Sequence, residues 1–392
     1  MKKAAITLLI TALCSTAASA GPREQAKRLH DRIAGVPADT VQLDQMQALI
    51  EAGNAIDAAH LAIEDPNFYS VTLKALVTPW TNEAQTPFAP LNDYTATVIG
   101  AVRDDLDFRT LLYDDILYIG NPSIGLPNYS LSNNNHYEQM EQQGVDLKAE
   151  LQRATQSEIN GLPSAATSGV ITSRAAAQAF FVDGTNRAMF RFTLMNHLCN
   201  DLEQIKDNTR SPDRIRQDVS RSPGGDSRIF VNACLGCHSG MDPLAQAYAY
   251  YDYSYDSDSD PEALNGQLVY TENSVQPKYL INANNFPYGY ATENDQWENY
   301  WRVGPNSTLG WDSNNLNLPA SGQGAKSLGI ELANSEAFAS CQVKKVFKSV
   351  CFRDPENSQD YNKIDSMSAS FKASNYNLKT VFAESAVYCM GE

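Results

Sequence analysis

Residues 234–238 read Cys-Leu-Gly-Cys-His, and they decide how the rest of the chain is interpreted. On a helical turn, cysteines three positions apart share one face, and each thiol can form a thioether bond to one porphyrin edge. The histidine that follows is placed to ligate the iron from below. With 7 Cys and 5 His in 392 residues, random order gives this pattern about 0.002 times per chain. The pattern predicts a covalent c-type haem on Cys234 and Cys237, with His238 as the iron ligand.

Half of a zinc site is the competing interpretation of the same residues. A structural zinc site needs four protein ligands, usually two Cys or His pairs at short spacing. This sequence has no second pair of that kind. It also has no second C-x-x-C-H, so the predicted cofactor is one covalently bound haem c.

An export signal is expected in residues 1–20. Lys2 and Lys3 form a basic start, residues 4–13 are apolar but too few to span a bilayer, and residues 18–20 read Ala-Ser-Ala, which fits a cleavage site. No later apolar run approaches the length of about 18 residues that a membrane span needs, so no transmembrane segment is expected in the mature chain. The predicted location is the periplasm or the exterior of the cell.

The chain is strongly acidic. Its formal charge is −16 at pH 7, and removal of Lys2 and Lys3 with the signal makes it two units more negative. Such a chain is not expected to bind nucleic acid or an anionic membrane through its overall field. The charge suits solubility, or docking to a basic surface on a redox partner protein.

Four cysteines remain after the signal and the haem motif are set aside. An even number of spare cysteines in an exported chain predicts disulfides, here two. The four are Cys199, Cys341, Cys351 and Cys389.

Helix geometry restricts how these four can pair. Residues 335–352 are expected to form one helix, which would separate Cys341 and Cys351 by about 15 Å along its axis. A disulfide needs its two Cα atoms within about 7 Å, so these two are not expected to pair with each other. A last helix over residues 378–388 is expected to pack antiparallel on this one and to bring Cys389 near Cys341. The predicted pairs are therefore Cys341–Cys389 and Cys199–Cys351.

Apolar residues recur at helical spacing in several stretches, which predicts a mainly α fold. Residues 42–64 are expected to form one amphipathic helix, whereas the polar, Ser- and Asn-rich stretch 354–377 is expected to be a connection. We expect a boundary near residue 160. It would separate an N-terminal helical region, 21–160, from a cytochrome c-like, helical haem-binding region, 161–392, that ends in disulfide-tied helices within a larger, loop-rich protein.

The sixth ligand of the iron is the open question at the sequence level. No His follows His238, and Met241 is too close to it in the chain to reach the opposite face of the ring. A helix before the motif carries Met189, Met195 and His197, each a candidate, and Met367 is a weaker one. Each of these residues is also an ordinary core residue. An open sixth position is the remaining alternative.

Two further features flank the motif. Arginines gather just before it, and Arg221 and Arg228 are the nearest candidates to pair with the haem propionates, or else with neighbouring Asp residues. After it, Asp242 and Pro243 are expected to be the N-cap and first residue of a new helix.

The residues around the motif resemble a known group. Residues 234–253, CLGCHSGMDPLAQAYAYYDY, are similar to the haem-attachment domain of planctomycete-type cytochrome c proteins, in which a D-P-L/I-G-F-A-like helix and an F-D follow C-x-x-C-H. Here Asp242-Pro243-Leu244 fits, Ala245 replaces the usual Gly, and Tyr251-Asp252 replaces F-D. That group is largely of unassigned function, so the resemblance implies the haem and the helical architecture, and it implies no substrate.

The predicted function is electron transfer by an exported single-haem c-type cytochrome. Sequence patterns of hydrolases, zinc proteases and P-loop enzymes are absent. Two alternatives stay open: a haem enzyme that acts on peroxide or another small molecule at an open sixth position, and a non-catalytic haem-containing adaptor.

Overall fold

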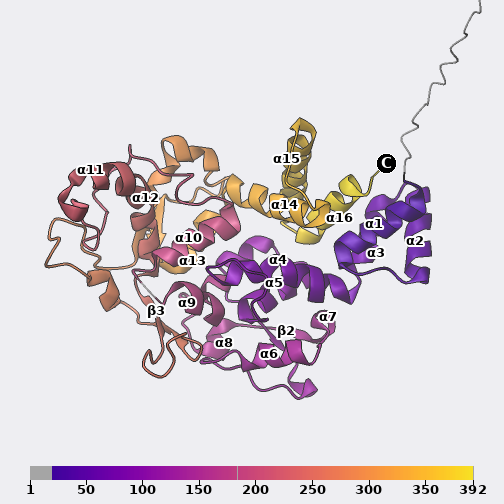
Figure 1. Ribbon diagram of the computed structural model, residues 1–392, viewed down its shortest axis with the longest axis horizontal. Coiled ribbons are helices and arrows are strands. Elements are labelled where there is room, and N and C mark those ends of the chain that lie inside the picture. The colour runs from indigo at the N-terminus through magenta and orange to yellow at the C-terminus, as the bar shows by residue number, and fades with distance from the viewer. Residues whose placement is uncertain (1–19, 183, 392) are drawn as a thin grey trace, which may run out of the picture.

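The computed structural model describes residues 20–182 and 184–391. The predicted export signal therefore lies, but for its last residue, outside the described residues. The molecule is elongated and mainly α-helical, as predicted, with three small two-stranded antiparallel sheets in its described part (Figure 1). Within that part, no helix combines the length and the apolar character needed to cross a membrane.

Three helices at one end form the N-terminal layer: α1 (Pro22–Ala34), α2 (Thr40–Glu51) and α3 (Ala55–Ile63). The single helix predicted over 42–64 is wrong, because the chain turns between α2 and α3, where Gly53 has a φ of 82°. A positive φ of this kind is easily adopted by Gly alone, which makes it a natural break between helices.

The central part combines short helices with the first sheet. Its helices are α4 (Lys74–Val77), α5 (Asp93–Arg103), α6 (Asn135–Gln142), α7 (Leu147–Glu150), α8 (Gln156–Asn160) and α9 (Arg174–Phe180). Strand β1 (Leu117–Gly120) pairs antiparallel with β2 (Leu151–Ala154). Helix α5 is buried over most of its length and begins where the Asn92 side chain accepts a hydrogen bond from the Thr95 amide.

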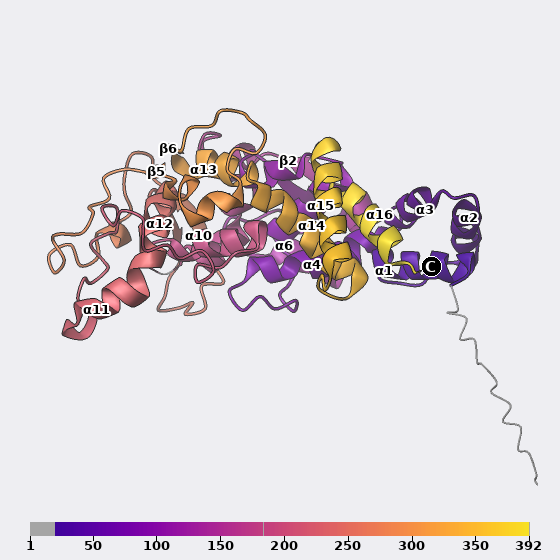
Figure 2. The ribbon, with the colours of Figure 1, turned by 90° about the horizontal axis from the view of Figure 1, so that it is seen from above.

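The opposite end of the molecule carries the Cys-Leu-Gly-Cys-His stretch. Its helices are α10 (Arg187–Thr193), α11 (Ser227–Ile229), α12 (Leu235–Ala245) and α13 (Gly324–Ala333). Strands β3 (Tyr251–Ser254) and β4 (Gln267–Tyr270) form one sheet, and β5 (Gln296–Glu298) and β6 (Ser321–Gln323) form another. Helix α10 packs on α12, and α11 protrudes at the far end from α1–α3 (Figure 2).

The chain ends in three packed helices: α14 (Glu336–Cys351), α15 (Ser358–Ala373) and α16 (Leu378–Cys389). The stretch predicted as a polar connection is mostly α15. Asn357 caps it, and Ile364, Met367 and Phe371 form a narrow apolar stripe on its buried face. Helix α16 also packs on α1 and α3, so the C-terminus returns to the N-terminal layer (Figure 1).

The disulfides correct the predicted pairing. The structure joins Cys199 to Cys341 and Cys351 to Cys389, with Cα–Cα distances of 5.2 and 5.5 Å. The predicted pairs, Cys341–Cys389 and Cys199–Cys351, are wrong because α15 intervenes between α14 and α16. Two successive reversals make α16 parallel to α14, so the C-terminal ends of both helices meet.

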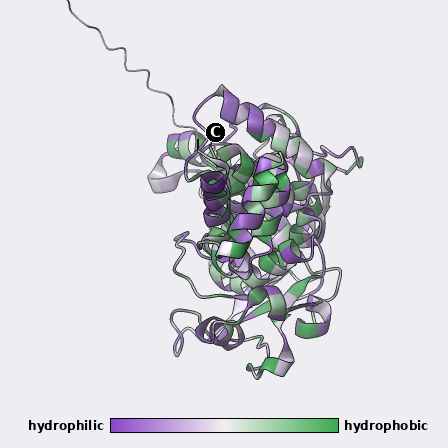
Figure 3. Ribbon diagram, turned by 90° about the vertical axis from the view of Figure 1, so that its right-hand side faces the viewer, coloured by the Kyte–Doolittle hydropathy of each residue, from purple (hydrophilic) through white to green (hydrophobic). Residues whose placement is uncertain are grey.

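One hydrophobic cluster runs through most of the molecule. It includes four fully buried side chains from distant helices: Leu29 of α1, Val98 of α5, Leu244 of α12 and Phe382 of α16. Figure 3 shows apolar positions gathered among the packed helices and polar positions toward the outer loops. The core therefore contains residues on both sides of the boundary predicted near residue 160, which stays a prediction.

Candidate cofactor-attachment site

A nearly continuous helical segment presents the two thiols and the imidazole. It begins where the Asp226 side chain accepts a hydrogen bond from the Arg228 amide, and it continues through α11, the π-helical turn η8 (Phe230–Cys234) and α12. Cys234 and Cys237 are both unpaired and partly exposed. Two free thiols are therefore held on adjacent turns of one exposed segment.

The thiols lie on a surface that carries both polar groups and exposed apolar side chains. Cys237 Sγ lies 3.6 Å from the Leu202 carbonyl oxygen. Burial, and then the nearby Glu203 carboxylate, raise the pKa of Cys237 above its ordinary value. Ile229 and Val231, one turn before the thiols, are 45% and 48% exposed. These exposed apolar side chains on the same helical segment are available for contact with an apolar group.

The helix does not break where the sequence predicted a break. Pro243 lies inside α12, which continues to Ala245, so the expectation that Asp242 and Pro243 open a new helix is wrong. Proline removes one backbone hydrogen bond but leaves the preceding turn intact here. Asp242 therefore stands four residues after His238 on the same helical face, and His238 Nδ1 lies 3.1 Å from Asp242 Oδ1.

The imidazole of His238 is oriented by this contact. Its side chain is 20% exposed, whereas the side chain of Asp242 is fully buried. Because the carboxylate accepts a hydrogen bond, the proton of a neutral ring is held on Nδ1. Nε2 has no hydrogen-bond partner within the described part of the chain, which leaves its lone pair available to a metal ion.

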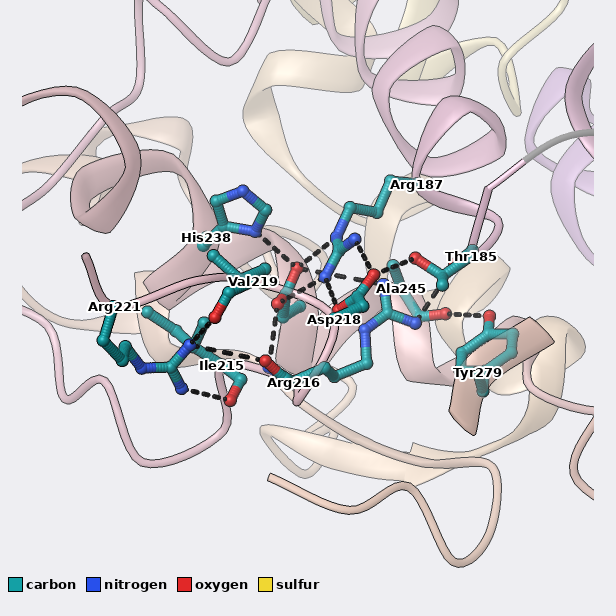
Figure 4. A network of polar contacts seen from close by, with 11 residues as sticks. Thr185, Arg187, Ile215, Arg216, Asp218, Val219, Arg221, His238, Ala245 and Tyr279 are labelled. Atoms are coloured by element: carbon teal, nitrogen blue, oxygen red, sulfur yellow. Dashed lines mark hydrogen bonds and ion pairs between the residues drawn. The ribbon is translucent and has the colours of Figure 1, made fainter. Parts of the chain in front are cut away.

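Asp242 belongs to a buried polar network whose members Arg187, Arg216 and Asp218 are labelled in Figure 4. Arg187, the first residue of α10, donates from Nε to Asp242 Oδ1 at 2.7 Å and from Nη2 to Oδ2 at 2.9 Å. The same guanidinium bonds Asp218, with 2.8 Å between Nη2 and Oδ1. The Arg216 amide donates to Asp242 Oδ2 at 3.1 Å. Both carboxylate oxygens therefore have partners besides the histidine.

The electrostatics of the network favour an ionised carboxylate. Burial opposes the charge of Asp242, but the Arg187 and Arg216 guanidiniums and the hydrogen bond from His238 hold its pKa well below the ordinary range. At Asp218, burial raises the pKa, but the hydrogen bonds and charge of Arg187 outweigh burial, so the pKa of Asp218 is also lowered. The charges of the two carboxylates and the two guanidiniums cancel, and the Arg221 guanidinium also lies near both carboxylates.

Sequence reasoning missed Arg216, which is fully buried. Its Nη1 donates to the Thr185 carbonyl at 3.1 Å, and its guanidinium carbon lies 4.6 Å from the centre of the Tyr279 ring. The only signal in the sequence was that Arg216 lies among several arginines before the motif. Which of them is buried depends on the tertiary fold.

The two arginines proposed for haem propionates have other partners. Arg221 donates to the backbone carbonyls of Val219 and Ile215 at 2.6 and 2.8 Å. Arg228 is exposed and bonds Asp226 at 2.7 Å, which matches the alternative of pairing with a neighbouring Asp. Their role toward propionates stays a prediction.

The four candidates for the sixth ligand lie on different elements. Met189 is buried on α10, the helix that packs on α12. Met195 is half-buried in the π-helical segment η6 (Leu194–Leu198), which packs on α14. His197, also in η6, is fully buried, and its Nε2 lies 2.8 Å from the hydroxyl of Tyr94.

Met367 is the fourth candidate and lies within the C-terminal helices. Its sulfur accepts a hydrogen bond from the Ser385 hydroxyl at 3.4 Å, and both side chains are buried. Its helix, α15, packs on α14 and α16 and lies apart from α12 in both ribbon views (Figures 1 and 2). His197, Met367 and Met189 are all buried in the core, and Met189 lies on the helix that packs on α12.

A zinc site lacks ligands in this arrangement. Among residues 20–182 and 184–391, no group of three or more His, Cys, Asp or Glu side chains is arranged to hold a metal ion. A structural zinc ion needs four such ligands. The two free thiols and His238 are three side chains of the types that a c-type haem uses, and they lie on one helical segment.

Comparisons of this chain with models of known protein families, with curated proteins and with solved structures found no match.

Proposed function

We propose that this protein is an exported, single-haem c-type cytochrome that transfers electrons. The observation that carries the proposal is the set of donors on one helical segment. Cys234 and Cys237 are free while the other four described cysteines are paired, and His238 has Nδ1 held and Nε2 available. The four residues Cys234, Cys237, His238 and Asp242 all belong to one local stretch.

Each residue has a defined task in this proposal. Cys234 and Cys237 anchor the porphyrin edge through thioether bonds, and His238 Nε2 ligates the iron. When bound, the haem supplies a one-electron Fe(III)/Fe(II) couple. Asp242 holds the Nδ1 proton and thus the orientation of the His238 ring, and Ile229 and Val231 supply apolar contact.

The surface charge supports a second part of the proposal, a basic redox partner. A formal charge of −16 favours encounter with a positively charged docking surface and disfavours an acidic one. The encounter would weaken as ionic strength rises, because salt screens exposed charges over about 8–10 Å.

Covalent haem is tested by expression in a bacterium that attaches c-type haem in its periplasm. We expect haem staining of the denatured wild-type chain on a gel, and a haem-bearing peptide that contains Cys234 and Cys237. The double variant Cys234→Ala with Cys237→Ala should lose the stain. A matched control, Cys351→Ala with Cys389→Ala, removes two cysteines elsewhere and should keep it. A wild-type chain without covalent haem, or a double variant that keeps it, would contradict the proposal.

Absorption spectra then separate electron transfer from the alternatives. A reducible low-spin haem that does not bind carbon monoxide agrees with electron transfer. A high-spin haem that binds carbon monoxide would instead favour an enzyme with an open sixth position. A haem that dithionite cannot reduce would favour an adaptor in which the haem is structural.

A further inference from the structure

We propose that Asp242 is a positioning residue that lowers the reduction potential of the haem by holding the Nδ1 proton of His238. This inference rests on the proposed function, because it concerns the residue behind the predicted iron ligand. It assigns to Asp242, a residue outside the C-x-x-C-H pattern, a role in setting the reduction potential of the iron.

The first support is geometric. His238 and Asp242 lie four residues apart on α12, with 3.1 Å between Nδ1 and Oδ1. The carboxylate cannot easily turn away, because Arg187 binds both of its oxygens and the Arg216 amide binds Oδ2. A carboxylate fixed in this way fixes the plane of the imidazole and the tautomer that leaves Nε2 for the metal.

The second support is the set of groups that surround the carboxylate. Arg187 forms an ion pair with Asp242 and binds both of its oxygens, and the Arg216 guanidinium lies 3.8 Å from Oδ1. The side chain of Asp242 is fully buried, so the contact with His238 is not weakened by competing water. The carboxylate is therefore a strong, charged acceptor for the imidazole N–H.

The consequence for the iron follows from ligand basicity. A carboxylate that draws the Nδ1 proton makes the imidazole a stronger electron donor at Nε2. A stronger donor stabilises Fe(III) more than Fe(II), and second-shell hydrogen bonding is one of the ways in which a protein sets a haem potential. A histidine bonded to a neutral backbone carbonyl would donate less.

Arg187 moderates this effect. Its Nε shares Asp242 Oδ1 with His238, so part of the carboxylate charge is directed to the guanidinium. Asp218 in turn draws Arg187 toward itself through two hydrogen bonds. Neutralising Asp218 should leave Arg187 more strongly bound to Asp242 and weaken the pull of Asp242 on His238.

The test is a spectroelectrochemical titration of the covalently attached haem. For Asp242→Asn we expect the Fe(II)/Fe(III) ratio at a fixed potential to rise about tenfold, which is about 59 mV for a one-electron couple. Asp218→Asn should shift the potential in the same direction by less. Asp226→Asn is the matched control, since it removes a carboxylate at the start of the same helical segment without contacting His238, and it should leave the potential unchanged.

The outcomes separate the two proposals. A wild-type chain without covalent haem refutes the proposed function. A wild-type chain with haem, together with an Asp242→Asn variant whose far-UV circular dichroism is native and whose potential is unchanged or lower, refutes the role of Asp242. If Asp242→Asn does not fold, Asp218→Asn decides: a raised potential agrees with the inference, and an unchanged or lower one overturns it.

Discussion

The backbone of Gly240 lies directly against the indole ring of Trp301. A Cβ atom at position 240 would fall 2.0 Å from Nε1 of that ring, far inside van der Waals contact. Trp301 is fully buried and lies 5.9 Å, between ring centres, from Phe190 of α10. Gly240, two residues after His238, is thus where the backbone of α12 packs closely against the core.

Gly240→Ala should destabilise the fold, whereas Gly236→Ala should not. Ala is the better helix former at both sites by about 1 kcal/mol. At 240 a methyl group meets the buried ring, and overpacking costs about 1–3 kcal/mol. At 236 it meets the amide end of the Asn208 side chain, which can move. Chemical denaturation followed by circular dichroism measures both variants, and equal stabilities would contradict this account.

The disulfide connectivity should appear in peptides from unreduced protein. We expect one cross-linked species that joins the peptides of Cys199 and Cys341, and another that joins those of Cys351 and Cys389. Mass spectrometry with and without reduction distinguishes them from the alternative linkage Cys341–Cys389. Removing the Cys351–Cys389 bond, which closes a loop of 38 residues, should destabilise the chain by about 4 kcal/mol on the loop-entropy relation.

His197 should make the protein sensitive to acid. Burial, and then the charge of Lys345, lower its pKa from 6.5 to about 3 in the folded chain. The unfolded chain takes up a proton on this residue below about pH 6.5, so the stability it contributes is complete above that pH and is lost as pH falls toward 3. Between pH 7 and 4.5 the wild type should lose about 2–3 kcal/mol more than His197→Gln.

This comparison has a matched control on the surface. His60→Gln replaces an exposed histidine and should lose as much stability on acidification as the wild type does. Denaturant midpoints at the two pH values give the measurement. A His197→Gln variant with the wild-type acid sensitivity would show that His197 can be protonated in the folded chain.

Extraction with acidified acetone should leave the haem with the protein. That treatment removes haem held only by its axial ligand, whereas thioether bonds through Cys234 and Cys237 persist. A single variant, Cys234→Ser, keeps one thioether and should also retain haem. If the colour of the wild type passes into the acetone phase, the haem is held by His238 alone or not by this site.

The sequence predicted the mainly α fold, because apolar residues recur at helical spacing in several stretches, such as the one that contains α2 and α3. It missed α15, since a stripe of only Ile364, Met367 and Phe371 is hard to see among Ser, Asn and Lys residues. That one omission also produced the wrong disulfide pairs. Adding a helix between α14 and α16 reverses which ends of those helices meet.

At the candidate site, the sequence predicted the thiols and the imidazole but not the buried polar network that contacts the imidazole. Cys234, Cys237 and His238 were predicted from a local pattern, and the structure leaves both thiols unpaired, whereas attachment of haem to them stays a prediction. Asp242 was read as a helix cap because Asp-Pro commonly begins a helix. Its contact with Arg187 joins residues 55 positions apart, and contacts of that kind depend on tertiary packing rather than on local pattern.

The order of the cysteines along the chain has a consequence for biogenesis. Cys199 pairs with Cys341, 142 residues later, and the two free thiols Cys234 and Cys237 lie between them in the sequence. As the chain emerges in order, Cys234 and Cys237 are therefore available to Cys199 before Cys341 is. An early bond between Cys199 and either thiol would have to be exchanged before the observed pair could form, so the correct disulfide depends on the arrival of α14.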